Sequence, residues 1–317
     1  MFFSLSKRSA EGRSSRAFGG DGMKKLFPEA SAVWVMLFSL CLMALAGHAR
    51  GQGSAVLGLN VELEPGQQFS PGWILTAPRF TSNLTYPLLI DEAGDVRYNE
   101  NRPYEGFNFD LQENNTLAWF STLNGWWHQL DSAMAVSDSI EYVGGDVDFH
   151  DIELREDGTT LLMGQEVITM NVIDSVPNPN DSMRYVLDCL LQELDENGNV
   201  IWSWRASEHI SPLYCTHCVW EASLIDAYHQ NSFETQDNGD ILLSIRNMDR
   251  VVLIDKSSGD LVWQLGGVAS DFVFTNDNGA FAQQHDAQLV EENRLLLFDN
   301  ATGSSPLTSR GAEYLLD

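Results

Sequence analysis

The chain has 317 residues, of which 44% are hydrophobic and 20% are charged, a composition that supports a packed core and excludes a largely disordered chain. Its formal net charge is −27 at pH 7. A surface this acidic is repelled by a phosphate backbone, which excludes nucleic acid as a partner, and it is typical of a highly soluble protein.

The N-terminal region has the pattern of a targeting signal. A short positive segment at 23–25 precedes an almost uninterrupted apolar run over 32–47, and the small residues Ala44, Ala46 and Ala49 offer cleavage sites. The apolar run is shorter than the roughly 20 residues that a membrane-spanning helix needs. We therefore predict a cleaved signal peptide and no stable membrane insertion after cleavage, so that the protein is exported and periplasmic or secreted.

The rest of the chain has the pattern of an all-β protein. Short alternating or apolar runs are separated by turns rich in Asp, Asn and Gly, at 91–94, 156–158, 195–198, 236–239 and 257–259. Asn-Gly and Asp-Gly accept the positive φ angles of tight hairpin turns. The sequence therefore predicts many short antiparallel strands joined by hairpins.

Two phrases alternate along these strands. In one, a turn is followed by a strand that ends in Tyr98, Trp202 or Trp263; in the other, a turn is followed by an aliphatic strand, as at 161–163 and 241–243. The copies recur at irregular spacings of roughly 50 to 80 residues, as propeller blades with loop insertions would. We predict an N-terminal extension and signal peptide over 1–52 and a β-propeller over 53–317.

A histidine precedes each aliphatic strand at nearly the same distance. His150 lies 11 residues before Leu161, His229 lies 12 before Ile241, and His285 lies 10 before Leu295. Equivalent positions in different blades converge on the channel of a propeller. One such histidine is more often a satisfied structural side chain than a functional one, but three in one register predict a shared site.

Three imidazoles are also a familiar set of zinc or copper ligands, with Asp151 and Asp286 as candidate carboxylates behind them. Arg246, at the end of the strand that follows His229, favours an oxyanion over a metal cation, because a guanidinium is always charged and offers several donors. The alternative for Arg246 is a surface ion pair. Asn231, two residues after His229, is expected on the same face of the strand as a neutral donor.

At these residues the sequence resembles the arylsulfate sulfotransferases. The stretches that carry the resemblance are His229-Gln230-Asn231-Ser232 with Leu243-Ser244-Ile245-Arg246, Trp263-Gln264-Leu265-Gly266-Gly267 with Ser270-Asp271-Phe272, and the segment from Gln284-His285-Asp286-Ala287 to Leu297-Phe298-Asp299-Asn300. The order and spacing of these stretches are specific to the family, and the resemblance extends over about 72–317, more weakly before His150.

The resemblance implies a six-bladed propeller that moves a sulfuryl group from an aryl sulfate to a phenol without a cofactor. His285 would be the nucleophile that becomes transiently sulfated, and His150 and His229 would be acid/base groups. Arg246 and Asn231 would bind the sulfuryl oxygens. The partners would be small aryl sulfates and phenols.

Two departures from the family pattern stand out. Ala301 follows the Phe-Asp-Asn segment where the family usually has Gly. By the family pattern the chain also stops in mid-blade at Asp317, so that the last blade or so, with a threonine that contacts the sulfuryl group, is expected to be missing. The activity is therefore expected of the complete protein, and whether this fragment has it stays open.

Three cysteines follow the predicted cleavage site. The spacing of Cys215 and Cys218 favours a local disulfide, with Cys189 unpaired. If the two cysteines were half of a metal site, a second pair of ligands would be needed, and the sequence shows none. If they were a redox pair, they would need a strand-to-helix context that the sequence does not show. For the whole protein two alternatives stay open beside the sulfotransferase: a metal-dependent propeller enzyme and a propeller that binds a ligand without catalysis.

Overall fold

The structure is a computed structural model. It describes residues 72–77, 87–91, 95–99, 106–172, 183–277, 280–291, 293–302 and 308–317. The predicted signal peptide lies outside the described residues, as does most of the predicted turn at 91–94. Within the described residues no helix is long and apolar enough to cross a membrane.

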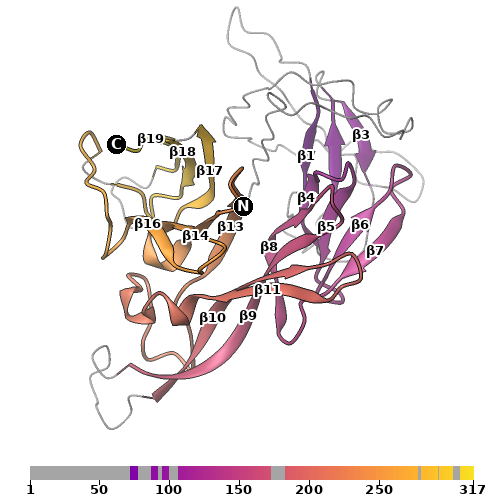
Figure 1. Cartoon of the computed structure of the whole chain (residues 1–317). Coiled ribbons are helices and arrows are strands. Elements are labelled where there is room, and N and C mark those ends of the chain that lie inside the picture. Colours follow the sequence, from indigo (N-terminus) through magenta and orange to yellow (C-terminus); the bar gives the residue numbers. More distant parts are fainter. Residues whose placement is uncertain are drawn as a thin grey trace, which may run out of the picture. The chain divides into compact units, whose positions relative to one another are not determined.

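The chain divides into two compact units at Ile140 and Glu141. The first unit contains two sheets, β1-β2-β3 and β4-β5-β6-β7, whose neighbouring strands are antiparallel (Figure 1). The strands are β1 (Ile74–Thr76), β2 (Leu88–Ile90), β3 (Val96–Asn99), β4 (Gly106–Leu111), β5 (Leu117–Ser121), β6 (Trp126–Leu130) and β7 (Val136–Ile140). Buried residues of β4 to β6, with Tyr98 and Leu75 against them, form its core.

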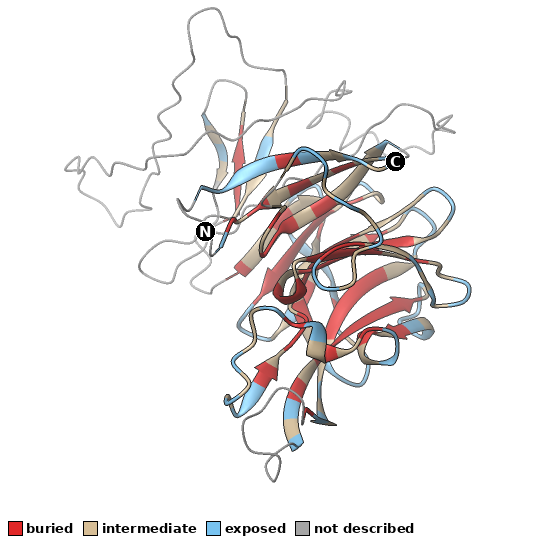
Figure 2. Ribbon diagram, turned by 90° about the vertical axis from the view of Figure 1, so that its left-hand side faces the viewer, coloured by how far each residue is buried: buried red, intermediate tan, exposed pale blue. Residues whose placement is uncertain are grey.

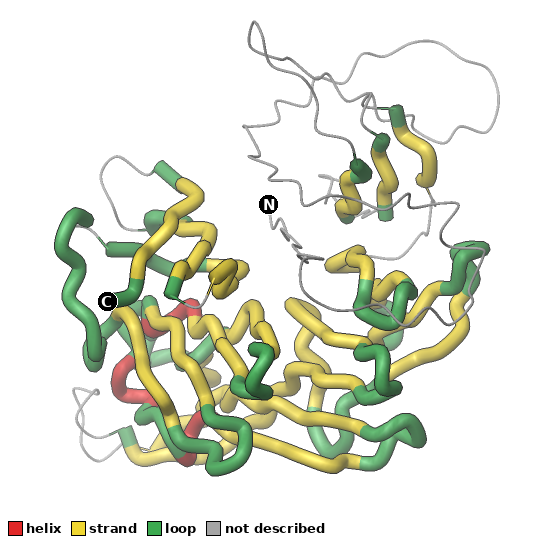
Figure 3. Tube along the Cα trace, turned by 45° about the horizontal axis from the view of Figure 1, so that its top comes forward, coloured by secondary structure: helices red, strands yellow, loops and turns green. Residues whose placement is uncertain are grey.

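The second unit contains three sheets, of which the first also has β12 as a short parallel neighbour of β10. Its first sheet comprises β8 (Asp146–Leu154), β9 (Thr160–Asn171), β10 (Met183–Leu194), β11 (Val200–Arg205) and β12 (Leu224–Asp226). The second comprises β13 (Gln230–Thr235), β14 (Ile241–Ile245), β15 (Arg250–Ile254) and β16 (Leu261–Gly266), and the third β17 (His285–Glu291), β18 (Arg294–Asp299) and β19 (Arg310–Leu315). Short 3-10 turns, η4 (Ala206–Glu208), η5 (Pro212–Tyr214) and η6 (Arg246–Met248), are the helical elements of the described chain (Figure 3).

The hairpin turns fall where the sequence predicts them. The turn at 195–198 joins β10 to β11, and the turn at 236–239 joins β13 to β14. Gly198 and Gly239 have φ angles of 77° and 91°, a backbone region that only glycine enters without steric cost. The prediction of antiparallel strands joined by tight hairpins is confirmed in the described residues.

The core of the second unit lies between its sheets. Buried positions lie along the strands of the sheets (Figure 2). Strand β14 is buried throughout, and its apolar residues are divided between two hydrophobic clusters. Ile241, Leu243 and Ile245 pack towards the sheet of β8 to β11, whereas Leu242 packs towards the sheet of β17 to β19. Because successive side chains of a strand point to opposite faces, β14 packs against a neighbouring sheet on each side. An inner blade of a propeller packs in the same way.

The first strands of the three sheets are neighbours, because β8 contacts β13 and β13 contacts β17. Consecutive antiparallel sheets whose first strands meet are the arrangement of β-propeller blades. The all-β propeller prediction is confirmed, with five sheets in the described residues against the six blades that the resemblance implies. This arrangement brings β8 and the starts of β13 and β17 together.

Candidate active site

His150 lies in the middle of β8, where pairing with β9 is interrupted between Val147 and Ile152. Its side chain is 7% exposed, and its Nδ1 lies 2.7 Å from Oδ1 of Asp148. That carboxylate also accepts the backbone N–H of His150 and the side-chain amide of Gln165. Because a carboxylate only accepts hydrogen bonds, Nδ1 carries the proton and Nε2 the lone pair of the neutral ring.

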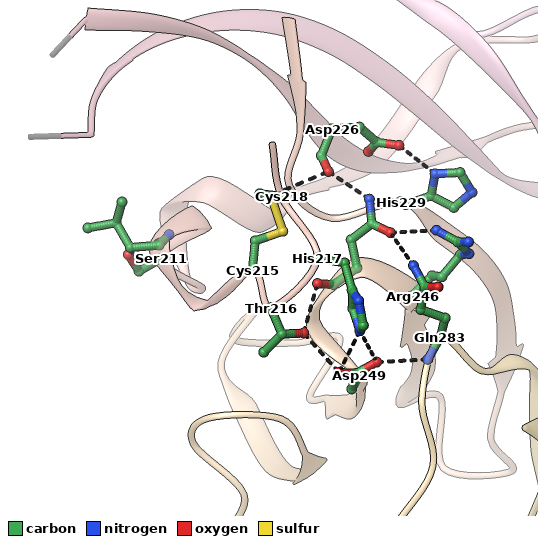
Figure 4. Close-up of a disulfide and its surroundings, with 12 residues drawn as sticks. Ser211, Cys215, Thr216, His217, Cys218, Asp226, His229, Arg246, Asp249 and Gln283 are labelled. Atoms are coloured by element: carbon green, nitrogen blue, oxygen red, sulfur yellow. Dashed lines mark hydrogen bonds and ion pairs between the residues drawn. A yellow bond between two sulfur atoms is a disulfide. The ribbon is translucent and has the colours of Figure 1, made fainter. Parts of the chain in front are cut away.

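His229 is the residue before β13 and has a left-handed backbone, with φ of 52°. Its Nδ1 is paired with a carboxylate oxygen of Asp226 (Figure 4). Its carbonyl oxygen accepts the backbone N–H of Arg246 at 3.1 Å, which joins the start of β13 to the end of β14. Because a carboxylate accepts from its Nδ1, His229 has the same tautomer as His150, with Asp226 in the role that Asp148 has for His150.

His285 is the first residue of β17 and is 8% exposed. Its Nδ1 donates to the carbonyl oxygen of Gln283 at 3.2 Å, so this ring also presents the lone pair on Nε2. Burial, followed by the positive charges of His150, Arg246 and His229, lowers the pKa of His285 from 6.5 to about 3. The imidazole is therefore neutral at physiological pH.

The three rings form one cluster. The ring centroids of His150 and His229 lie 5.3 Å apart, and those of His150 and His285 lie 6.3 Å apart. Phe149 stacks on His150 with a centroid distance of 4.0 Å, so an aromatic face borders the cluster. The structure brings together the three histidines that share a register in the sequence.

Arg246 is the first residue of η6 and is partly buried. Its Nη1 donates to Oδ1 of Asn247 at 2.7 Å, and the side-chain oxygen of Gln283, in the amide orientation that satisfies its neighbours, accepts from Nη1 at 2.8 Å and Nη2 at 3.2 Å. Burial lowers the pKa of Arg246, while the carboxylates of Asp226 and Asp249 act in the opposite direction. The alternative of a surface ion pair does not describe this residue, whose hydrogen-bond partners are two neutral amides.

Asn231 lies in β13 and is 5% exposed. Its side-chain amide donates to the carbonyl oxygen of Gln284 at 2.7 Å, one residue before His285. The pairing of β13 with β14 shifts register between Gln230 and Ser232, so simple alternation from His229 does not set the direction of Asn231. Its clearest contact ties β13 to the residue preceding His285.

Two carboxylates of the site were missed by the sequence analysis. Asp148 and Asp226 fix the histidines, whereas Asp151 accepts the backbone N–H of Phe233 at 3.0 Å and Asp286 accepts the side-chain amide of Gln288. The signal lay in the Asp-Phe-His order at 148–150, where a residue two positions away shares the face of a strand. No comparable signal existed for Asp226, since the left-handed turn at His229 decides its contact.

Cys215 and Cys218 form a disulfide, and Cys189 is a buried free thiol, as the sequence favoured. Figure 4 shows the disulfide close to the site: Cys218 contacts the carbonyl oxygen of Asp226, whose carboxylate pairs with His229. Among the described residues, no group of three or more His, Cys, Asp or Glu side chains is arranged to hold a metal ion.

A β-propeller with a buried, neutral imidazole beside two carboxylate-paired histidines and an arginine defines a class of site suited to transfer of an anionic group. Comparison with known families agrees: residues 113–317 match the model described as Arylsulfotransferase (ASST), so the chain belongs to this family of aryl sulfotransferases. The resemblance seen in the sequence is thereby confirmed. The family acts on small aryl substrates.

No curated protein matches the chain. Among solved structures, it is similar to a protein of unknown function from Bacteroides caccae, with 10% identity, 77% of this chain and 73% of that chain covered, and a TM-score of 0.43. It is also similar to virginiamycin B lyase from Staphylococcus aureus, with 10% identity, coverage of 79% and 83%, and a TM-score of 0.42. These likenesses are too distant to bear on this chain's activity.

Proposed function

We propose that the protein transfers a sulfuryl group from an aryl sulfate to a phenol through a sulfated His285. His150 and His229 act as general acid and base, and Arg246 binds the sulfuryl oxygens with Asn231. The propeller comprises 53–317, and the protein works outside the cytoplasm after removal of a signal peptide within 1–52.

The observation that carries this proposal is the difference between the histidines. His285 is buried, has a pKa lowered to about 3, and has its Nδ1 on a neutral carbonyl, so its Nε2 is an unprotonated nucleophile. His150 and His229 have their Nδ1 atoms on carboxylates, which hold each ring in the orientation and tautomer that present Nε2 for proton exchange. One ring is suited to attack and two are suited to carry protons.

The first half-reaction forms one bond and breaks one. Nε2 of His285 attacks the sulfur of the aryl sulfate, an N–S bond forms, and the aryl S–O bond breaks. The departing phenolate takes a proton from the imidazolium of His150 or His229, which matters because an ordinary phenol has a pKa near 10. The sulfated ring keeps its Nδ1–H on the carbonyl of Gln283, which favours the positive charge on that ring.

The second half-reaction reverses these steps with a new phenol. The histidine that lost its proton accepts the proton of the acceptor hydroxyl, the phenolic oxygen attacks sulfur, and the N–S bond breaks. The products are a new aryl sulfate and neutral His285. Throughout both steps Arg246 provides fixed positive charge for the sulfuryl oxygens.

Export is supported by the apolar run over 32–47 and by the Cys215–Cys218 disulfide, since disulfides persist in oxidising compartments. The aromatic face of Phe149 beside His150 suits an aryl ring in the site.

The test is mass spectrometry of the complete protein, including the blade that the family pattern expects after Asp317, following brief exposure to 4-nitrophenyl sulfate. We expect one SO3 group on the peptide that contains His285, lost when phenol is added, with phenyl sulfate as the product. His285→Ala should give neither adduct nor product, and His209→Ala, in which the lost ring stacks on Trp204 away from the cluster, should give both. Wild-type protein that binds the sulfate ester but releases no nitrophenol would instead be a ligand-binding propeller.

A further inference from the structure

The turn that follows Arg246 is built around Asp249. This residue ends η6 in a left-handed conformation, with φ of 50° and ψ of 44°, and its N–H donates to the carbonyl oxygen of Arg246 at 3.1 Å. Aspartate tolerates this conformation better than most residues. The position of the Asp249 carboxylate is therefore tied to the backbone that carries Arg246.

The Asp249 carboxylate also reaches the segment that carries His285. Its Oδ1 accepts the backbone N–H of Gln283 at 2.7 Å, and Gln283 in turn accepts the Nδ1–H of His285. Gln283 has φ of 52°, a strained value for this residue type, so its conformation needs support from outside its own segment. Asp249 supplies that support one hydrogen bond away from the acceptor of the His285 ring.

Two side chains of the disulfide loop, residues 215–218, hold the same carboxylate. Nε2 of His217 lies 2.8 Å from both Oδ1 and Oδ2 of Asp249, and the hydroxyl of Thr216 donates to Oδ2 at 2.8 Å (Figure 4). The loop backbone is fixed as well, since the N–H of Thr216 donates to the carbonyl oxygen of Asn247 at 3.0 Å. None of these groups belongs to the histidine cluster itself.

Close backbone packing fixes the other side of the Asp249 turn. A Cβ atom on Gly266 would lie 2.3 Å from the carbonyl oxygen of Asp249, and one on Gly267 would lie 2.3 Å from that of Met248. Side chains of any size at these two positions would push the turn away, which gives a physical reason for the Gly-Gly pair after Trp263.

We infer that Asp249, held by Thr216 and His217 of the disulfide loop, is a positioning residue that sets Arg246 and His285 relative to each other for the transfer. It touches no reacting atom. Its carboxylate accepts hydrogen bonds from the loop on one side and from Gln283 on the other, so the arginine and the nucleophile share one anchor. This inference rests on the proposed function, because it assigns a purpose to the anchor only if His285 and Arg246 act together.

The test compares the rate at which His285 becomes sulfated in single-turnover experiments, read as nitrophenol release and as SO3 on the His285 peptide. We expect Asp249→Ala to lower this rate about 100-fold, the size of effect that a small misplacement of reacting groups produces. Asp249→Asn keeps one acceptor oxygen and should lie between Asp249→Ala and wild type. His217→Ala should be slower than His217→Gln, whose amide keeps a donor for the carboxylate.

Glu153→Ala is the matched control for Asp249→Ala. The Glu153 side chain is 13% exposed and that of Asp249 is 18% exposed, and both accept a backbone N–H and a threonine hydroxyl from another segment. Glu153 contacts Thr235 and Arg155 and no residue of the site, so its loss should alter thermal unfolding and leave the sulfation rate within about twofold.

Equal sulfation rates for Asp249→Ala and Glu153→Ala overturn the inference while leaving the sulfohistidine intact. If Asp249→Ala does not fold, the inference is tested with the variants His217→Ala and His217→Gln. The His217 side chain is 26% exposed, so its replacement disturbs the core less. There, equal rates for His217→Ala and His217→Gln overturn the inference, and recovery in the glutamine variant supports it. Wild-type protein with no adduct on His285 defeats the proposed function, and the positioning role with it.

Discussion

The ring centroids of His285 and His150 lie 6.3 Å apart. The two neighbouring rings have different hydrogen-bond partners at Nδ1. His150 has the carboxylate of Asp148, and His285 has the carbonyl oxygen of Gln283. The positive charge of a protonated His150 also disfavours a proton on His285. Protonation of one ring therefore keeps its neighbour nucleophilic, which is what a nucleophile beside a general acid requires.

The lowered pKa of His285 predicts how stability changes with pH. Between about pH 3 and 6.5 the folded chain keeps this ring neutral while the unfolded chain protonates it, so the unfolded state binds more protons. Stability therefore rises with pH across this window and is lost as pH falls, by up to about 1.4 kcal/mol per pH unit from this group. The measurement is the urea midpoint against pH for wild type and His285→Gln. The dependence should be shallower in the variant, and parallel curves would show that His285 titrates normally.

The carboxylates behind His150 and His229 make a second prediction. Asp148→Asn and Asp226→Asn each replace an acceptor by a group that also offers a donor to Nδ1, which disturbs the tautomer with Nε2 ready to carry the proton. We expect kcat to fall about 10- to 100-fold for each variant. Steady-state kinetics with a series of aryl sulfates checks this.

The loss in these variants should grow as the leaving phenolate becomes more basic, because such a phenolate depends more on proton donation. A loss that is the same for every leaving group would mean that the carboxylates shape the site without affecting proton transfer. Gln288, whose side-chain amide donates to Asp286, offers the control Gln288→Ala with kcat near that of wild type.

Much of the fold was predictable because its signals are local. The turns at 195–198 and 236–239 carry Asn-Gly, and the buried strand Ile241–Ile245 is apolar at every position except Ser244, so strand positions follow from neighbouring residues. The repeat of such phrases then indicated blades. What the sequence does not encode locally is the pairing of distant segments, such as β10 with β12 in parallel.

The histidine cluster was predictable for a related reason: nearly equal spacing from an aliphatic strand places His150, His229 and His285 at related positions of successive sheets. Asp226 and Asp249, which help to hold the cluster, escaped prediction because left-handed backbone at His229 and Asp249 redirects the chain where a strand pattern expects alternation. Asp249 and His217 are 32 residues apart in sequence, and nothing in either local pattern indicates that they meet.

Arg246 is predicted to need its guanidinium shape as well as its charge. Asn247, which accepts from Nη1, and Gln283, which accepts from both Nη atoms, fix the plane of the guanidinium, and a guanidinium held in one plane can bind two oxygens of one anion with its remaining donors. Arg246→Lys keeps the charge, and we expect it to raise the KM for the aryl sulfate about tenfold or more; Arg246→Ala should also lower kcat, since charge on the transferred group loses its donor. Kinetics over donor concentration separates the two effects. A lysine variant with wild-type KM would show that charge alone suffices.

The disulfide is predicted to contribute to stability in proportion to the short loop that it closes. Cys215 and Cys218 are separated by three positions, and a loop this small removes little entropy from the unfolded chain, about 2 kcal/mol in the chain-entropy account. The free energy of unfolding of the double variant Cys215→Ser, Cys218→Ser should therefore be lower by that amount. With an unchanged m-value, its urea midpoint should be lower in proportion. Cys189→Ala is the control for loss of a buried thiol outside the bridge.

Because Thr216 and His217 lie between the bridged cysteines and contact Asp249, the double variant should also sulfate His285 more slowly. A variant that loses the stability and keeps the wild-type sulfation rate would show that the loop holds Asp249 without its disulfide.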